Sequence, residues 1–145
     1  MQKTLDYPPV WLVACAALAW VFRSDGILPG FLAPLGIVLV LAALVLAAVA
    51  AYELRRHETT IVPHENADAL VTSGVYARSR NPIYLADVIV LVGLALIWGS
   101  TFGLVLAPVL AFVLERRFIL PEEARLAAKF GADFDAYRQT ARRWL

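Results

Sequence analysis

Residues 27–52 form an apolar run without one charged side chain, and this run limits what the chain can fold into. A helix needs about 20 apolar residues to cross a bilayer core, since each residue adds about 1.5 Å. Three further apolar runs lie at residues 9–22, 82–98 and 101–120, and 61% of all residues are hydrophobic. We therefore predict an all-α fold, a polytopic membrane helical bundle with about four transmembrane helices in a single domain, 1–145.

The basic residues predict the orientation of this bundle. Of the 13 Lys and Arg residues, all but Arg23 lie before the first run, between the second and third, or at the end of the fourth and beyond it. Four spans place these segments on one face, which the positive-inside rule assigns to the cytoplasm. We predict an integral protein of a bacterial or archaeal inner (cytoplasmic) membrane, with both termini in the cytoplasm.

Charge and cysteine content exclude several classes of protein. The net charge of +1 argues against a nucleic-acid partner, and a single cysteine allows no disulfide framework. His57 and His64 lie in a loop that also contains Pro63, without a tight set of ligands around them. A solvated loop is the better interpretation, so we expect no metal site.

The C-terminal segment is too polar to be a fifth span. Aromatic and small residues recur in it at three- and four-residue steps, at Phe130, Phe134, Tyr137, Ala141 and Trp144. This stripe predicts a cytoplasmic amphipathic helical segment that lies against the bundle or in the interface. Gly131 and Asp133 indicate a break, with the glycine ending one helix and the aspartate capping the next.

The motif "RNPIYLAD", residues 80–87, stands where the third apolar run begins. Asn81 is a good N-cap and Pro82 a good first helical residue, so we expect a helix to begin here. A helix N-terminus attracts anions, and Arg80 and Tyr84 stand beside it, so the motif predicts a site for a carboxylate or phosphate. For each of these residues alone, a helix start or an interfacial anchor is the better explanation.

Asp87 is harder to explain without a function. It lies three residues after Tyr84 and projects from the same face of the predicted helix. A carboxylate inside a span is costly unless it faces a cavity or a partner, and so short a side chain cannot reach the membrane surface easily. We therefore treat Asp87 as a candidate functional residue.

A second charged cluster, Glu122 and Glu123, follows Pro121. Acidic residues in the first turn of a helix that begins at Pro121 interact favourably with the helix dipole. Considered by themselves, the two glutamates need no other explanation. Together with Arg80 and Tyr84, however, they place both signs of charge on the cytoplasmic face, which suits a ligand with an ammonium and a carboxylate. Residues 115–117, "ERR", either close this site or mark the interface.

These motifs resemble those of the integral-membrane methyltransferases typified by isoprenylcysteine carboxyl methyltransferase and the phospholipid N-methyltransferases. That family has R-H-P-x-Y-x-G at the start of a membrane helix, then a paired E-E, then a pattern like F-G-x-x-Y-x-x-Y. Here "RNPIYLA" (80–86), Glu122 with Glu123, and "FGADFDAY" (130–137) follow in the same order, and Gly74 and Tyr76 resemble the approach to the first motif. Asn81 replaces the motif histidine and cannot take up a proton, and Ala86 replaces the glycine.

The resemblance implies a methyltransferase that uses S-adenosylmethionine and releases S-adenosylhomocysteine. Its acceptor would be a lipophilic or lipidated molecule from the bilayer, with an isoprenylcysteine-like carboxylate, a thiol or a lipid amine as the reacting group. The cofactor would bind at residues 74–87 and 115–143. The predicted cofactor-binding residues are Tyr76, Arg80, Asn81, Pro82, Tyr84, Glu122 and Glu123, and the predicted catalytic residues are Arg80, Asp87 and Tyr137.

Two alternatives stay open. A nicotinamide-dependent membrane reductase related to the sterol reductases would resemble this family in its C-terminal helices, but the E-E pair argues against a phosphate-rich cofactor. A non-catalytic membrane scaffold subunit would explain the loss of the motif histidine. The oligomeric state is not predicted.

Overall fold

The computed structural model describes residues 7–23, 27–59 and 69–145, so Lys3 and His64 lie outside the described residues. Every element in these three ranges is helical, which confirms the all-α prediction. In chain order the elements are α1 (Pro8–Val21), the 3₁₀ turn η2 (Gly30–Leu32), α2 (Ala33–Arg56), the 3₁₀ turn η3 (Gly74–Ala77), α3 (Pro82–Trp98), α4 (Thr101–Leu114), the π-helical turn η4 (Glu115–Ile119), α5 (Leu120–Phe130) and α6 (Ala132–Thr140).

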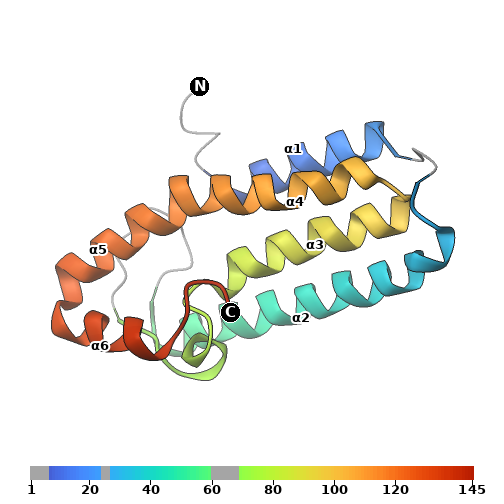
Figure 1. The fold of residues 1–145 in the computed structure, drawn as a ribbon. Coiled ribbons are helices and arrows are strands. Elements are labelled where there is room, and N and C mark those ends of the chain that lie inside the picture. The colour runs from blue at the N-terminus through green and yellow to red at the C-terminus, as the bar shows by residue number, and fades with distance from the viewer. Residues whose placement is uncertain (1–6, 24–26, 60–68) are drawn as a thin grey trace.

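The four longer apolar helices lie side by side and run alternately in opposite directions (Figure 1). α3 contacts α1, α2 and α4, so it is the central helix of the bundle. Its Tyr84 and Leu91 are buried against apolar side chains of α1, α4 and η4. This central position matters for function, because the "RNPIYLAD" motif opens α3.

α2 and α3 approach each other closely at two glycines, Gly36 and Gly93. A Cβ atom on Gly36 would lie 2.5 Å from the carbonyl oxygen of Gly93, and one on Gly93 would lie 2.7 Å from the carbonyl oxygen of Gly36. Small residues allow helix backbones to approach in this way. The contact holds α3 against the long helix α2.

The turn between α3 and α4 is built from two residues. Gly99 ends α3 with φ of 65°, in the left-handed region that favours glycine. Ser100 then caps α4, because its hydroxyl oxygen accepts a hydrogen bond from the amide of Gly103 at 3.1 Å. The start of α3 and the end of α4 are thereby brought to the same end of the bundle.

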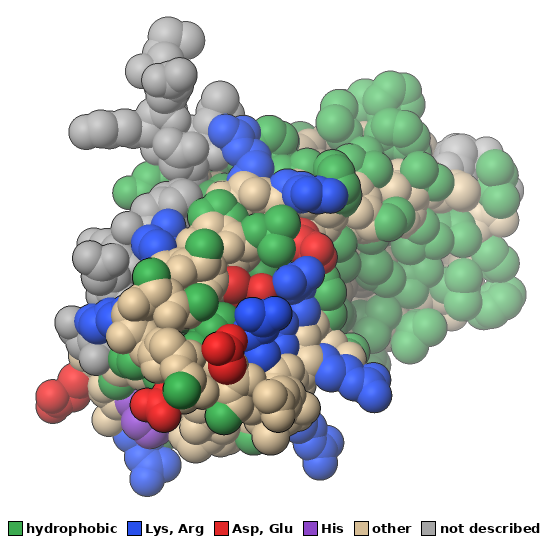
Figure 2. Space-filling view, turned by 60° about the vertical axis from the view of Figure 1, so that its left-hand side comes forward, with side chains coloured by type: hydrophobic (Ala, Val, Ile, Leu, Met, Phe, Trp, Pro, Cys, Tyr) green, Lys and Arg blue, Asp and Glu red, His purple; other side chains and the backbone are tan. Residues whose placement is uncertain are grey.

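Only one described helix, Gly30–Arg56, is long and apolar enough to cross a membrane by itself. Its outer surface exposes large apolar side chains, among them Leu35, Val38, Leu41 and Val45. Pro8–Val21 and Pro82–Trp98 are apolar but shorter. Charged side chains gather at the end of the molecule that holds α5 and α6, while the surface of the helical bundle behind them is apolar (Figure 2). The count of four spans therefore stays a prediction.

The expected helix start at Pro121 is confirmed, since α5 begins at Leu120 and has Pro121, Glu122 and Glu123 in its first turn, but α5 continues the fourth helix without a break. α4, η4 and α5 form one continuous helical rod (Figure 1), and the residues at both junctions keep right-handed helical angles. Proline lacks an amide hydrogen and its ring crowds the carbonyl four residues earlier. The wider π-helical turn directly before Pro121 relieves this crowding without breaking the helix.

The predicted break at Gly131 is confirmed. α5 ends at Phe130, Gly131 has φ of 52°, and α6 folds back beneath α5. The predicted cap is wrong, since Gly131 itself occupies the N-cap position of α6 and Asp133 lies in the first turn. The aromatic stripe packs as expected up to Ala141, where the helix has ended.

Candidate functional site

The start of α3 is bound to the last residues of the chain. The amide of Arg80 donates to the carbonyl oxygen of Arg142 at 2.8 Å, and the amide of Arg142 donates to the carbonyl oxygen of Arg78 at 3.1 Å. Residues 141–145 therefore run alongside the motif, an arrangement that helical periodicity in the sequence does not indicate.

Asn81 precedes Pro82 as predicted, but it does not cap α3 with its side chain. Its Nδ2 donates instead to the carbonyl oxygen of Arg143 at 2.9 Å, and Asn81 is buried. The amide group at the position of the motif histidine thus holds the C-terminal segment. A side chain with both a donor and an acceptor is sufficient for this contact.

Arg80 is held by an acid of the second motif, 43 residues away in the chain. Its Nε and Nη2 donate to Oε1 of Glu123 at 3.1 and 2.9 Å, and its Nη1 donates to the carbonyl oxygen of Ala141 at 2.6 Å. The side chains of Arg80 and Glu123 are only 10% and 11% exposed. The structure therefore brings the two predicted clusters together, and it also occupies the guanidinium that was expected to receive an anion.

Arg143 joins two acids of the rod. Its Nη1 lies 3.0 Å from Oε1 of Glu115, and its Nη2 lies 2.9 Å from Oε2 of Glu123. The indole nitrogen of Trp144 donates to the other oxygen of Glu115 at 2.9 Å. Glu115, in the π-helical turn, is thus joined to the network through Arg143 and Trp144, while its expected role in closing a ligand site stays a prediction.

The ion pairs determine the protonation of Glu123. Burial by itself would raise the pKa of this carboxyl group, but hydrogen bonds from Arg143 and Arg80 outweigh burial and hold it below its ordinary value. The same contact with Glu123 raises the pKa of Arg143. Glu123 is therefore a carboxylate at neutral pH.

Glu122 faces a pair of tyrosines. The hydroxyl of Tyr84 donates to Oε2 of Glu122 at 3.1 Å. The pKa of Tyr76 is raised, first by burial and then by the negative charge of Glu122, so this phenol is neutral at physiological pH. Tyr76 and Tyr84 are 7% and 8% exposed. The half-buried Glu122 and the buried Tyr76 and Tyr84 form a polar wall beside the Arg80–Glu123 pair.

Tyr137 anchors α6 to the segment before α3. Its buried hydroxyl donates to the carbonyl oxygen of Tyr76 at 2.7 Å, and burial raises the pKa of the phenol. The phenol of Tyr137 thus already has a backbone partner, which is a positioning role. Its predicted catalytic role stays a prediction.

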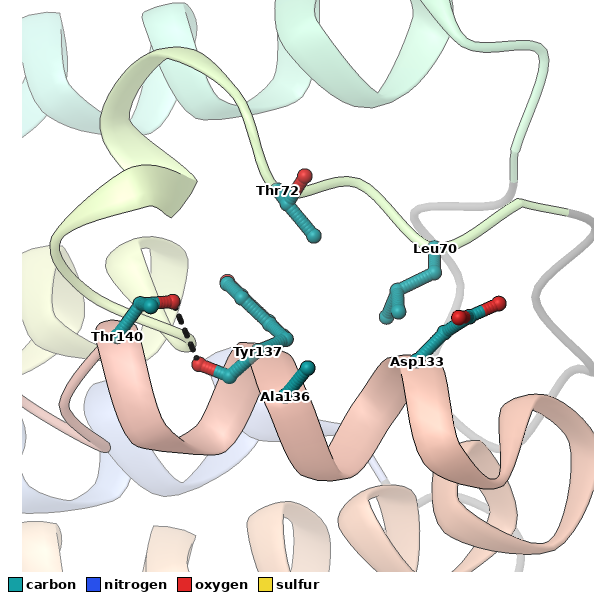
Figure 3. A pocket seen from close by; sticks show the side chains of 6 residues that line it. All are labelled: Leu70, Thr72, Asp133, Ala136, Tyr137 and Thr140. Carbon is teal, nitrogen blue, oxygen red and sulfur yellow. Dashed lines mark hydrogen bonds between the residues drawn. The ribbon is translucent and has the colours of Figure 1, made fainter.

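A cavity of about 440 Å³ opens between α6 and the segment before η3 (Figure 3). It is lined by Leu70, Thr72, Asp133, Ala136, Tyr137 and Thr140. Tyr137 alone among the predicted site residues contributes to it. None of the lining residues takes part in the ion pairs of Arg80 and Arg143, so we do not assign the cavity to the same ligand.

Where the chain is described, no group of three or more His, Cys, Asp or Glu side chains is arranged to hold a metal ion. Nδ1 of His57 lies 2.9 Å from the carbonyl oxygen of Glu53, its own helix neighbour. The Glu53 carboxylate accepts a hydrogen bond from the hydroxyl of Ser73, which fastens the following segment to α2.

The sequence-family model for the phospholipid methyltransferases (PEMT) matches residues 32–133 of the chain. The chain belongs to this family. The family resemblance predicted from the motifs is thereby confirmed, and membership makes this chain a membrane-associated methyltransferase in general terms. No curated protein matches the chain significantly.

The phospholipid methyltransferase match includes Arg80, Tyr84 and both glutamates but ends before residues 141–145. Sequence reasoning included Arg143 only as the last residue of the predicted cofactor-binding region, and it assigned no role in the site to Arg143 or Trp144. The signal was chemical: Arg142 and Arg143 stand directly before Trp144, the last residue of the aromatic stripe. Nothing in their spacing shows that they reach back to Glu115 and Glu123.

Proposed function

We propose that this phospholipid methyltransferase family member uses S-adenosylmethionine to methylate a lipophilic acceptor. One observation carries the proposal: the two motifs of charged residues meet at one place, where Arg80 and Arg143 share Glu123 and Tyr84 binds Glu122. This network contains three carboxylates, those of Glu115, Glu122 and Glu123, and the guanidiniums of Arg80 and Arg143 are both paired with acids. Such a site suits a cationic ligand.

The chemistry of S-adenosylmethionine fits this balance of charge. The cofactor carries a sulfonium and an ammonium, and when bound it would supply the methyl group. Glu122, with its tyrosine neighbours, would hold the cationic groups, and the backbone of residues 78–81 would lie beside them. Nicotinamide dinucleotides instead carry phosphates, which need basic groups that are free to bind them. Arg80 and Arg143 are engaged with acids, which disfavours the reductase alternative.

The proposed topology places this site at the cytoplasmic ends of four spans. α1, α2, α3 and the α4 rod would cross the bilayer, and the acceptor would reach the site from the lipid phase. A test uses cysteines at either end of the bundle, since the natural Cys15 is buried. Leu145→Cys should react with an impermeant maleimide only from the cytoplasmic side and Arg23→Cys only from the other. Labelling of both from one side would contradict four spans.

The function is tested by titrating S-adenosylhomocysteine into the detergent-purified full chain in a calorimeter. Glu122→Gln removes one charge and retains the size of the side chain, so we expect at least a tenfold loss of affinity. Asp135→Asn, on the exposed surface of α6, is the control and should bind like the unaltered protein. Absence of binding in a folded protein, or binding of NADPH instead, would overturn the proposal.

A further inference from the structure

The π-helical turn η4 turns its side chains to different sides of the rod. Phe118 and Ile119 are buried in the core of the bundle, and Glu115 takes part in the network of the candidate site. Arg116 and Arg117 are exposed instead. The motif "ERR" is therefore divided: its acid faces the candidate site, and its two arginines lie on the outer surface of the rod, where the proposed cofactor chemistry gives them no role.

Each of these arginines lies over an aromatic ring. The guanidinium carbon of Arg116 is 5.4 Å from the centre of the Phe112 ring, and that of Arg117 is 5.2 Å from the centre of the Trp11 ring. Cation–π attraction holds a guanidinium in place and leaves its charge intact. Trp11 belongs to α1 and Phe112 to α4, two helices that are in contact. Two positive charges are thus held near the junction of α1 with the rod.

An apolar stripe of α4 leads up to Arg116. Phe102, Val105, Val109 and Phe112 are all exposed and recur at three- and four-residue steps, so they lie along one face of the helix. A further step of four residues reaches Arg116, whose guanidinium lies over the last ring of the stripe. At about 1.5 Å per residue the stripe is about 15 Å long, which is about half of a bilayer core. It is therefore long enough to cover the acyl chain region of one leaflet.

The partner that fits this surface is both apolar and anionic. The chain belongs to a membrane-associated family, so an exposed apolar stripe on a proposed span meets lipid acyl chains. In the ranges that the structure describes, Arg116 forms no ion pair, so no acid neutralises its charge there. Figure 2 shows basic side chains at the border between the charged end and the apolar surface of the bundle. A phosphate at that border would receive charge-assisted hydrogen bonds from a guanidinium.

We propose that this surface binds an anionic phospholipid of the leaflet next to the charged end, which is the cytoplasmic leaflet in the proposed topology. The lipid phosphate lies between the guanidiniums of Arg116 and Arg117, and an acyl chain lies along the stripe of α4. The lipid is a bound partner and not the methyl acceptor, since phosphatidylglycerol, for example, has no amine, thiol or carboxylate. A zwitterionic lipid would bring an ammonium group close to two guanidiniums, which repel it. The inference depends on the membrane topology and not on methyl transfer, so it and the proposed methyl transfer can fail separately.

The first experiment measures lipid binding to the detergent-purified full chain by native mass spectrometry, which resolves each bound lipid. Dioleoylphosphatidylglycerol and dioleoylphosphatidylcholine have the same acyl chains and differ in net charge. We expect the first phosphatidylglycerol to bind at least about tenfold more tightly, because each basic residue near an anionic lipid contributes about a fivefold gain in affinity (about 1 kcal/mol). Equal affinities of the two lipids would overturn the inference. An excess of inorganic phosphate should not displace the lipid, and displacement would show a simple anion site instead.

Substitutions then test whether the lipid binds at this surface. We expect Arg116→Gln to bind phosphatidylglycerol about fivefold more weakly, with unchanged affinity for phosphatidylcholine. Arg116→Lys retains the positive charge and should retain most of the affinity. Arg56→Gln is the matched control, because Arg56 is also exposed at the end of an apolar helix, α2, but no aromatic ring of the described chain lies beneath it. This control should bind phosphatidylglycerol nearly as tightly as the unaltered protein. An equal loss in Arg56→Gln and Arg116→Gln would reduce the effect to interfacial charge in general and overturn the site.

The apolar part of the surface has its own test. Val109→Gln places a polar group in the middle of the stripe, and because Val109 is exposed, the helix content measured by circular dichroism should stay unchanged. We expect both lipids to bind this variant more weakly than they bind the unaltered protein. Unchanged lipid binding would show that no acyl chain lies along the stripe. If the stripe instead joins two copies of the chain, the spectrum will contain a dimer that Val109→Gln dissociates, and that result would also overturn the lipid inference.

Discussion

Arg80 and Glu123 form a buried ion pair at 2.9 Å that joins the start of α3 to the first turn of α5. Removing one partner of a buried pair leaves an uncompensated charge, at a cost of about 3–5 kcal/mol. We expect Glu123→Ala and Arg80→Ala each to lower the free energy of unfolding by such an amount. The double variant should lose less than the sum, because neither charge is then left alone.

An exposed pair provides the control for this double-mutant cycle. Arg138 and Asp135 lie 3.7 Å apart with side chains 51% and 67% exposed. The corresponding alanine variants should change the free energy of unfolding by no more than about 1 kcal/mol. Denaturant titration in detergent measures both cycles. Strictly additive losses for Arg80 and Glu123 would show that the buried pair is not coupled.

Adjacent arginines at the end of the chain should differ sharply. Arg143 binds Glu115 and Glu123, whereas Arg142 is exposed and its guanidinium reaches only the carbonyl oxygen of Leu145, at 3.5 Å. We expect Arg143→Ala to weaken S-adenosylhomocysteine binding at least tenfold, because Glu123 loses one of the two groups that orient it. Arg142→Ala should bind nearly normally. Calorimetric titration measures the affinity of both variants for S-adenosylhomocysteine. Equal affinities of the two variants would contradict a role for Arg143.

Acid should release the C-terminal segment. The pKa of Glu123 is held below its ordinary value of 4.5, so its ion pairs contribute stability that is fully present above that pH. The contribution is lost as pH falls through the lowered pKa of the folded state. We expect residues 141–145 to resist an acid-stable carboxypeptidase at pH 5 and to be removed faster below pH 4.5. In Arg143→Ala the segment should be susceptible at both values, and an unaltered protein that is equally susceptible at pH 5 would refute this.

The glycine contact between α2 and α3 should tolerate no methyl group. In Gly93→Ala the new Cβ would lie 2.7 Å from both the carbonyl oxygen of Gly36 and Cγ2 of Val40. Overpacking of this kind costs about 1–3 kcal/mol, and a clash with backbone leaves little room for relief. Gly30→Ala, which would meet nothing within 4 Å, is the matched control. Thermal unfolding in detergent should separate the two variants by several degrees, with Gly30→Ala close to the unaltered protein.

Tyr137→Phe separates a structural role from a catalytic one. The hydroxyl of Tyr137 donates to the carbonyl oxygen of Tyr76, and a hydrogen bond of this kind contributes about 0.5–1.5 kcal/mol to stability. We expect a loss of that size in the free energy of unfolding and less than a tenfold loss in the methylation rate. A 100-fold loss of rate with unchanged stability would instead assign Tyr137 to catalysis.

Local patterns in the sequence were sufficient for much of the fold. The third apolar run, 82–98, coincides with α3, because proline begins that helix and glycine ends it. Gly131 broke the C-terminal segment where predicted, since a positive φ suits glycine. These features depend on neighbours along the chain. The family, too, follows from short motifs, and the phospholipid methyltransferase match confirms it.

Other features depended on contacts between distant residues, and no local pattern encodes them. Asn81 is of a residue type that favours the N-cap position and it precedes Pro82, yet its side chain binds the carbonyl oxygen of Arg143, 62 residues away. The expected anion site at Arg80 is filled by Glu123, because a buried guanidinium binds the carboxylate that folding brings to it. The sequence alone thus determined the helices, the charged motifs and the family. Only the tertiary structure decided which charges neutralise one another, and left Asp87 without a partner in the described chain.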